Sequence, residues 1–352
     1  MAETATQVVR SLFGMTLSKL EAVAREADLQ PFAARQLADW LYRKHADSFD
    51  RMTNLSARTR QWLERHCTVG VSTPESVAES GDGTRKYLFE AASGRFVETA
   101  FIPEGTRATL CLSVQVGCRM GCVFCATGRQ GFQGNLGPGA ILNQYRSLPE
   151  RDRITNVVYM GMGEPLDNLD NVLDSLEVFG ADWGYGLSPA RITVSTVGLV
   201  PAMRSFLARS RCHLAVSMHS PFEEERRTLM PVEHAYPLHE VLDTIRECGQ
   251  GGRRRISFEY IMFDGVNDTR RHARELARIL EGIHCRINLI PFHPIPGPPL
   301  RPSPREQIER FQSWLKASGI MTTIRASRGL DIAAACGLLS TRRLVAAAQT
   351  AD

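Results

Sequence analysis

The stretch "GCRMGCVFCATG", residues 117–128, places three cysteines, Cys118, Cys122 and Cys125, within eight positions. A structural zinc site usually closes with four ligands, and a disulfide framework uses cysteines in pairs. Three soft thiolates at the spacing C-x3-C-x2-C instead suit a four-iron–four-sulfur (4Fe–4S) cluster that leaves one iron open. The open iron is then free to bind a further ligand. A structural zinc knuckle is the alternative, but no second Cys/His pair follows at the spacing of a zinc finger.

An alternation of strand and helix patterns surrounds this motif. Short apolar runs predict strands at residues 109–116, 155–160, 191–196, 212–219, 256–263, 285–292 and 322–327. Helical patterns lie between them, as at residues 239–248 and 268–282. Repeats of this length indicate parallel βαβ units, so we expect an α/β fold with a full or partial (βα) barrel. The cysteines follow the first strand, at the carboxyl end where such barrels place their chemistry.

The first 66 residues have helical patterns. Apolar residues recur at helical spacing in residues 16–29, 31–45 and 56–66. Thr16 is a candidate cap of the first helix, and Pro31 occupies a favoured first position of the second.

Residues 68–105 have a different pattern, in which "RKYLFEAASGRFVETAFIP" predicts a hairpin that turns near Ser93–Gly94. We therefore expect a helical accessory domain at 1–66, a small β-hairpin linker at 67–105 and the barrel core at 106–345.

The net charge of +4 is only weakly basic, but 38 of the 42 cationic side chains are arginines. Arginine suits phosphate contacts and stacking on bases, although a codon bias explains the same excess. Charge alone therefore does not establish an RNA partner. Nine cysteines without a secretory signal pattern indicate a reducing compartment, and we expect a cytoplasmic protein. The longest apolar runs have the length of strands, so we expect no membrane partner.

A second motif, "MGMGEP" at residues 160–165, ends the second predicted strand. Its glycines let the backbone approach a ligand, and the Glu164 carboxylate can accept a hydrogen bond from an amino group. Alone this pattern is as often an ordinary turn. After a C-x3-C-x2-C loop, however, it resembles the radical SAM superfamily, which implies that S-adenosylmethionine (SAM) binds the open iron through its amino and carboxylate groups. Ser195, Ser217 and His219 also end strands, although each alone is more often a structural polar residue.

The remaining cysteines carry little local signal. Cys111 lies on the strand before the motif, and Cys336 lies among small residues in "GLDIAAACGLL". Composition alone favours a buried structural role for Cys336. Core burial is likewise the expectation for Cys67, Cys212, Cys248 and Cys285.

Five stretches together carry a resemblance to a known family: "RATLCLSVQVGCRMGCVFCATGRQGF", "NVVYMGMGEPLDN", "STVGLVP", "NLIPFHPIPG" and "DIAAACG". They resemble the RlmN/Cfr family of RNA adenine methyltransferases, and the similarity runs from about residue 10 to 345. The resemblance implies a partial (βα) radical SAM barrel. It also implies a 4Fe–4S cluster on Cys118, Cys122 and Cys125, and two SAM molecules per turnover.

The resemblance assigns roles to further residues. Cys336 matches the cysteine that first accepts a methyl group from SAM as S-methylcysteine. A second SAM is then cleaved reductively, and its 5′-deoxyadenosyl radical activates that methyl group to add to adenine. Cys111 matches the thiol that releases the product by a transient disulfide with Cys336, and Glu98 matches the base that removes the C2 proton. From its strand alone, Glu98 would be an exposed carboxylate.

The SAM contacts implied by the resemblance are Gly163, Glu164, Ser195, Ser217, Met218, His219 and His293. RlmN enzymes commonly have asparagine where this chain has His293. The radical route suits the substrate, because adenine C2 is electrophilic and cannot attack a SAM sulfonium as a nucleophile.

RlmN-like enzymes methylate C2 of one adenosine in the peptidyl-transferase loop of 23S rRNA, and some also methylate the adenosine 3′ of certain tRNA anticodons. Cfr-like enzymes methylate C8 of the same ribosomal base and confer antibiotic resistance. "GMGEP" favours RlmN and "HSPFEEERRTLMP" favours Cfr; we prefer the C2 interpretation. The target base has to leave its fold, so the helical domain and arginines are expected to hold the RNA backbone.

The family resemblance further implies a reducing electron donor such as flavodoxin, and we expect a monomer. Two other classes stay open at this point. One is an RNA-binding protein with a purely structural cluster. The other is a radical SAM enzyme for a small molecule, which would not need the N-terminal helical domain.

Overall fold

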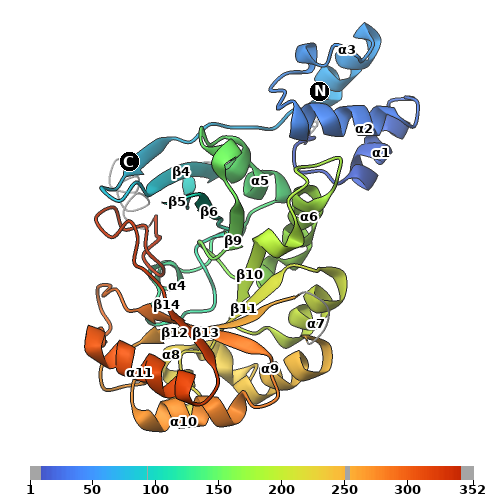
Figure 1. Cartoon of the computed structure of the whole chain (residues 1–352). Coiled ribbons are helices and arrows are strands. Elements are labelled where there is room, and N and C mark those ends of the chain that lie inside the picture. The colour runs from blue at the N-terminus through green and yellow to red at the C-terminus, as the bar shows by residue number, and fades with distance from the viewer. Residues whose placement is uncertain (1–8, 93, 250–253, 342–352) are drawn as a thin grey trace, which may run out of the picture. The chain divides into compact units, whose positions relative to one another are not determined.

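The computed structural model describes residues 9–92, 94–249 and 254–341, which form two compact units (Figure 1). The N-terminal unit comprises residues 1–73, 136–151 and 170–188, and the barrel unit comprises 74–135, 152–169 and 189–352. The boundaries expected at residues 66 and 105 stay a prediction. Among the described residues, no helix combines the length and apolar character needed to cross a membrane.

The N-terminal unit is helical. Its helices are α1 (Leu17–Glu26), α2 (Ala33–Ala38), α3 (Ala57–His66), α5 (Pro138–Arg146) and most of α6 (Leu169–Gly180). A π-helical turn (Asp39–Arg43) extends α2, and a 3₁₀ turn spans Phe49–Arg51. Two short parallel strands, β1 (Arg10–Ser11) and β2 (Cys67–Thr68), pair beside them.

The three predicted N-terminal helices are confirmed, with one correction at a helix start. Thr16 does occupy the N-cap position of α1, although its side chain bonds Ser18 and not the backbone. Ser56 caps α3 by accepting from the Thr59 amide at 3.1 Å. The prediction that the second helix begins at Pro31 is wrong, because α2 begins at Ala33 with Phe32 as its N-cap.

The barrel unit is built on one ten-stranded sheet, ordered β14-β13-β12-β11-β10-β9-β6-β5-β4-β3. The strands are β3 (Ser76–Glu79), β4 (Arg85–Ala92), β5 (Arg95–Glu104), β6 (Arg107–Cys111), β9 (Asn156–Tyr159), β10 (Ile192–Thr196), β11 (His213–Ser217), β12 (Ile256–Met262), β13 (Cys285–Pro291) and β14 (Met321–Ile324). Pairing is parallel from β14 to β6 and antiparallel from β6 to β3. Because β14 and β3 are the two edges, the parallel part is a partial barrel.

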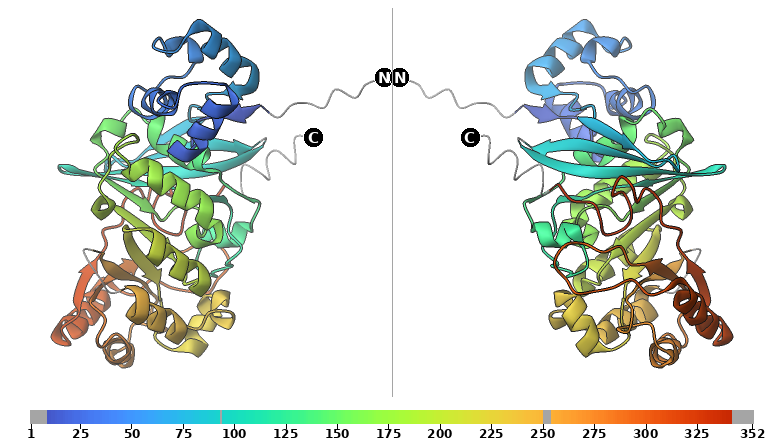
Figure 2. Two further views of the ribbon diagram at one scale, coloured as in Figure 1. Left: turned by 90° about the vertical axis from the view of Figure 1, so that its right-hand side faces the viewer. Right: turned by 90° about the vertical axis from the view of Figure 1, so that its left-hand side faces the viewer.

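Figure 2 shows β4 and β5 as a long antiparallel ribbon. The hairpin predicted here is confirmed; Gly94 has a positive φ of 68°, and Ser93 lies outside the described residues. The helices of this unit are α4 (Ala126–Gln130), α7 (Val200–Arg209), α8 (Glu223–Leu229), α9 (Leu238–Thr244), α10 (Arg270–Ile279) and α11 (Arg305–Ala317). Shorter helical turns span Arg151–Arg153, Pro165–Asn168, Pro189–Arg191, Pro231–His234 and Ile245–Gly249.

All seven strands predicted for the barrel are confirmed, and one of them is divided. The predicted strand 109–116 ends at Cys111 in β6, and Gln115–Val116 form a separate strand, β7, that pairs with β8 (Gly134–Asn135). The chain bends between them because the Val114 and Gln115 amides both donate to the Met162 carbonyl. This bend directs the chain into the cysteine loop.

The parallel strands bury two chemically different faces. On β12, Phe258 and Tyr260 are fully buried, and Tyr260 stacks on Phe311 of α11 with ring centroids 5.5 Å apart. The alternate residues Ser257 and Glu259 line a cavity on the opposite face. Bulky branched side chains usually fill the interior of a closed (βα) barrel. In this partial barrel the interior carries polar side chains and open space, and it is here that we place the candidate site.

Candidate active site

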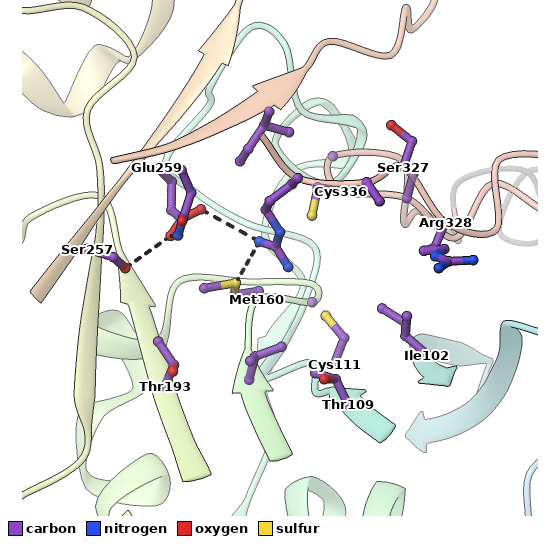
Figure 3. Close-up of a pocket in the computed structure, with 18 of the residues that line it drawn as sticks. Ile102, Thr109, Cys111, Met160, Thr193, Ser257, Glu259, Ser327, Arg328 and Cys336 are labelled. Atoms are coloured by element: carbon purple, nitrogen blue, oxygen red, sulfur yellow. Dashed lines mark hydrogen bonds and ion pairs between the residues drawn. The ribbon is translucent and has the colours of Figure 1, made fainter. Parts of the chain in front are cut away.

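Two adjoining cavities lie inside the partial barrel. The larger has a volume of about 540 Å³ and the smaller a volume of about 150 Å³. Both are lined by Cys125, Glu259, Arg325 and Cys336, so they adjoin one another at these residues. Figure 3 shows part of the lining of the larger cavity.

The three motif cysteines all line the smaller cavity. Burial raises the pKa of the Cys118 thiol to about 12 and that of Cys122 well above its ordinary value, and neighbouring cysteine charges add to both shifts. The three sulfurs are therefore close enough to repel one another as thiolates. A buried thiol gives up its proton when a metal compensates the charge, so soft, clustered thiols suit an iron–sulfur cluster.

The cysteine loop is closely packed. The Cys125 amide donates to the Cys122 carbonyl at 3.1 Å. A Cβ at Gly128 would lie 3.1 Å from both the amide nitrogen and the carbonyl oxygen of Cys122. Within the described residues, no three Asp, Glu, His or Cys side chains stand in metal-coordinating geometry. The cysteines thus fit a cluster by chemistry and proximity rather than by ligand distances.

The glycine-rich turn after β9 approaches the same cavity. Gly163 has a φ of 100°, and a Cβ there would lie 2.5 Å from the Cβ of Gln115, so this position requires glycine. Glu164 is buried and accepts from the Leu166 amide at 2.9 Å and the Val197 amide at 3.0 Å. Burial raises the pKa of Glu164 to about 7 despite these bonds. Its carboxyl thus links the end of β9 to the end of β10.

The other predicted SAM contacts fall into three groups. Ser195, Ser217 and His219 line the smaller cavity, as do Gly163 and Glu164. His293 lines the larger cavity. Met218 is fully buried and belongs to neither lining; its amide donates to the Glu259 carbonyl at 3.0 Å.

His219 has a defined orientation and charge. Its φ is 60°, and its Nδ1 accepts from the Ile261 amide at 3.1 Å. Burial lowers the pKa of His219 to about 3, so the ring is neutral and carries its proton on Nε2. The ring of Phe124 packs against it edge-on, with centroids 4.7 Å apart.

Arg226 supports the two strand ends that carry these residues. This guanidinium is fully buried and donates to the carbonyls of Val197, Ser217 and Met218 at 2.8–3.2 Å. It also forms an ion pair with buried Glu233. Sequence reasoning singled out this segment, "HSPFEEERRTLMP", only for family resemblance; the structure shows that it ties β10 to β11.

Cys111 and Cys336 meet at the larger cavity. Figure 3 shows their sulfurs pointing toward one another across it. Cys111 is buried against Ala100, Val158 and Ala334, and burial, followed by the charge of Cys336, raises the pKa of its thiol to about 12. Cys336 is only half-buried and lines both cavities, so the expectation from composition that it is a buried structural residue is wrong.

Core burial was also expected for four further cysteines, and it is found for two of them. Cys67 and Cys212 are buried as predicted. Cys248 is exposed and Cys285 is half-buried, so the prediction of core burial is wrong for both.

The segment that carries Cys336, residues 336–341, is attached to the cysteine loop. The Ala126 amide of α4 donates to the Gly337 carbonyl at 2.8 Å, and Thr127 donates to the Leu339 carbonyl at 2.7 Å. Gln130 accepts from the Thr341 amide at 3.0 Å. The short helix after Cys125 therefore holds this segment over the cavities.

Glu98 lies under this segment and outside both cavity linings. Its Oε2 accepts from the Ser340 amide at 2.9 Å, and its Oε1 forms an ion pair with Lys86 at 2.9 Å. The expectation from its strand alone, an exposed carboxylate, is wrong because Ser340 and Lys86 enclose a side chain that is 10% exposed.

Sequence reasoning missed a set of mostly polar residues that line the two cavities. Met160, Glu259 and Arg325 line both cavities, and Asn288 lines the larger one. The available signal was Glu259 in "ISFEYIMF", a lone carboxylate within an otherwise apolar strand. A carboxylate in the apolar core would cost much free energy, so such a residue indicates that its face of the strand meets a polar site.

Two family models match the chain. The model of the Radical SAM superfamily matches residues 112–278, and one described as "Ribosomal RNA large subunit methyltransferase N-terminal domain" matches residues 10–69. The crystal structure of a radical SAM methyltransferase from Sphaerobacter thermophilus superposes with a TM-score of 0.86 at 38% identity, covering 94% of this chain and 99% of that chain.

Curated relatives match over nearly the whole length. A protein of Porphyromonas gingivalis is 55% identical over 341 residues, which cover 97% of this chain and 96% of the relative. One of Parabacteroides distasonis is 52% identical over 336 residues, or 96% of this chain and 98% of the relative. Both are named "Probable dual-specificity RNA methyltransferase RlmN". The "Dual-specificity RNA methyltransferase RlmN" of Syntrophotalea carbinolica is 42% identical over 329 residues, covering 93% of this chain and 89% of the relative.

Proposed function

The chain belongs to the RlmN family of radical SAM RNA methyltransferases, and from that premise we propose that it methylates C2 of an adenosine in the peptidyl-transferase loop of 23S rRNA. The adenosine 3′ of the anticodon in some tRNAs is the proposed second substrate, in line with the dual specificity in the relatives' names. The predicted family, radical SAM fold and enzyme class are confirmed. Family membership favours an RNA methyltransferase over an RNA-binding protein or a small-molecule enzyme.

Enzymes of this family use a 4Fe–4S cluster and SAM. We assign the cluster to Cys118, Cys122 and Cys125, and when bound it supplies the electron that cleaves SAM. The assigned SAM contacts are Gly163, Glu164, Ser195, Ser217, Met218, His219 and His293. Support for this set comes from the smaller cavity, which five of these residues line together with the three cysteines.

One observation carries the proposed mechanism: Cys111 and Cys336 face one another across a cavity that adjoins the one lined by the motif cysteines. The two thiols differ in environment. Burial raises the pKa of Cys111 and keeps this thiol protonated, whereas Cys336 is only half-buried. Cys336 also lines both cavities, including the one lined by the motif cysteines, so it is the proposed methyl carrier.

Cys111 is the proposed resolving thiol. As the Cys111 thiol gives up its proton, its sulfur attacks the Cys336 sulfur of the enzyme–RNA adduct, which breaks the sulfur–carbon bond and leaves a disulfide. The electron pair passes to the departing carbon, which takes up a proton and becomes the product methyl group. Glu98 is the proposed base for the C2 proton. Its hydrogen bond with the Ser340 amide holds it against the segment that carries Cys336.

We further propose that the enzyme works in the cytoplasm, where its RNA substrates are found, as a monomer that takes electrons from a reductant such as flavodoxin. The helical unit and the arginines are proposed to hold the RNA backbone.

The test is methylation of unmodified RNA by anaerobically reconstituted enzyme with SAM and reductant. Mass spectrometry of digested 23S rRNA and tRNA should detect 2-methyladenosine at the predicted positions. Detection of 8-methyladenosine would support the Cfr-like alternative, and an absence of methylated adenosine in both RNAs would contradict the proposed function.

A further inference from the structure

Glu259 is a buried carboxylate at the junction of the two cavities, and none of the roles assigned above uses it. Only 4% of the residue is exposed. It lies on β12 between Ser257 and Ile261, which point to the same face of the strand, and it lines both cavities. Figure 3 shows it close to Ser257 and Met160 inside the larger cavity.

One carboxylate oxygen of Glu259 is fully engaged by its neighbours. Its Oε1 accepts from Asn288 Nδ2 at 2.7 Å and from Ser257 Oγ at 3.1 Å. Thr323 donates to the Asn288 Oδ1 at 2.6 Å, which directs the amide of Asn288 toward Glu259. These contacts fix the plane of the carboxylate.

The second oxygen is not engaged in the same way. Within the described residues, Glu259 Oε2 is buried and has no hydrogen-bond partner. Arg325 Nη1 lies 3.6 Å away, which is an ion-pair distance but too long for a hydrogen bond. The same Arg325 nitrogen lies 3.4 Å from Met160 Sδ. A buried acceptor in this state gains free energy when a ligand brings it a donor.

The position of Glu259 relative to Cys336 identifies a donor. Both residues line both cavities, and Arg325 interacts with the charges of both, so a base held against Cys336 shares its cavity with Glu259. In adenine the exocyclic amine is separated from C2 only by C6 and N1. If C2 faces Cys336, the amine is therefore nearby on the same edge of the ring.

We infer that Glu259 Oε2 accepts a hydrogen bond from the exocyclic amine of the target adenine and thereby selects this base. Carboxylates read exocyclic amines in other nucleic-acid sites. A guanine in the same pose would present a carbonyl oxygen to the carboxylate, which repels it. This inference rests on the proposed function and names a subsite within it.

A hydrogen-bond donor for Glu259 Oε2 has a second candidate source, because Glu259 also lines the smaller cavity, the proposed SAM site. A hydroxyl or amino group of SAM would then be the donor. The two sources predict different dependences on the RNA base, and the experiment separates them.

The experiment compares two otherwise identical RNA substrates that carry adenosine or purine riboside, which lacks the amine, at the target position. Each is tested with the wild-type holoenzyme and with Glu259→Gln. For the wild type, kcat/KM should be roughly tenfold to a hundredfold higher with adenosine, as for a hydrogen bond to a charged group. Glu259→Gln, whose amide also presents a donor, should lose most of this preference. The intrinsic reactivity of each base affects both enzymes equally and cancels in the ratio.

Three further measurements complete the test. The Kd for SAM and the rate of SAM cleavage without RNA should change less than about threefold in Glu259→Gln, below the effect of one lost hydrogen bond to a charged group. Equilibrium binding of the two RNAs should show the same loss of preference without turnover. Glu259→Asp, which keeps an acceptor, should retain a preference for adenosine, and iron content checks that both variants fold.

An unchanged preference in Glu259→Gln would overturn the inference. So would weaker SAM binding with equal losses for both RNAs, because the donor would then belong to SAM. A wild type that methylates adenosine and purine RNAs equally well overturns the subsite but leaves the proposed function intact. A wild type that methylates neither RNA overturns both.

Discussion

The two cavities differ in how their residues are distributed along the chain. The smaller cavity collects residues from short motifs, such as Cys118, Cys122 and Cys125 or Gly163 and Glu164. The larger one brings Cys111 of β6 together with Cys336, which lies near the end of the described chain. The proposed cluster ligands are thus encoded locally, whereas the proposed chemistry on the substrate depends on contacts between distant segments.

The largest effect should come from the local motif. Cys122→Ala removes one of three thiolates that no nearby residue replaces, so iron should fall from about four per chain to near zero. SAM cleavage and RNA methylation should both become undetectable. Iron analysis and 5′-deoxyadenosine assays measure this, and Cys285→Ala, in a half-buried cysteine outside both cavities, is the control. Retention of iron by Cys122→Ala would contradict the assignment.

The next effect separates the two thiols of the larger cavity. Cys336→Ala should abolish transfer of methyl to the protein and to RNA, while the cluster and SAM cleavage persist. Cys111→Ala should accept the methyl and attack adenine, and should then stall as a covalent enzyme–RNA species. A Cys→Ala change costs each variant at most a few kcal/mol of stability, too similar to explain different outcomes.

A gel-shifted, RNase-sensitive species in Cys111→Ala is the measurement, and it should be absent from the double variant. Cys212→Ala serves as a control for the loss of a buried thiol. If Cys336→Ala still methylates RNA, Cys336 does not carry the methyl group.

A smaller effect is expected at Arg226, the buried guanidinium that supports the ends of β10 and β11. Arg226→Met leaves Glu233 buried without its cation, so the free energy of unfolding should fall by about 3–5 kcal/mol. Denaturant unfolding of the cluster-free protein measures this loss. Adding Glu233→Gln should recover part of the stability, and equal losses in the single and double variants would argue against the buried pair.

The smallest effect is the pH dependence of Glu164. Burial raises the pKa of Glu164 from 4.5 to about 7, so folding favours its protonated form. The stabilisation is complete below about pH 4.5 and is lost as the pH rises to about 7, a change of about 3 kcal/mol.

Glu164→Gln is uncharged at every pH and provides the reference. Unfolding of both cluster-free proteins between pH 4.5 and 8 should show the wild type losing stability relative to Glu164→Gln as the pH rises. A constant difference would mean that burial does not control this carboxyl.

The contrast between local motifs and contacts of distant segments also explains which features the sequence could predict. The strands of the barrel were predictable because each is a short apolar run between turn residues, and the cysteine and glycine motifs stand directly after two of them. The break of the strand at Cys111 was not, because it depends on a carbonyl at Met162. Burial of Glu98 depends on Ser340, and no local pattern reports a partner so far along the chain.

Arg325 and Glu259 were missed for a related reason. Glu259 is a lone carboxylate in an apolar strand, but its sequence neighbours do not name its partner. Only the open interior of the partial barrel brings it together with Arg325 beside Cys336. Alternation along β12 does place Ser257 and Glu259 on one face, but it does not say whether that face meets a cavity or solvent.

The attachment of residues 336–341 to α4 has a kinetic consequence. Gly337, Leu339 and Thr341 are all bonded to that helix, and Cys336 directly precedes them. In the proposed cycle the same Cys336 sulfur meets two SAM molecules in turn. The smaller cavity then has to admit one SAM, release S-adenosylhomocysteine and admit the next before RNA is modified. The proposed cycle therefore predicts a double-displacement order, in which the first product leaves before the last substrate reacts and competes with SAM for the vacated cavity.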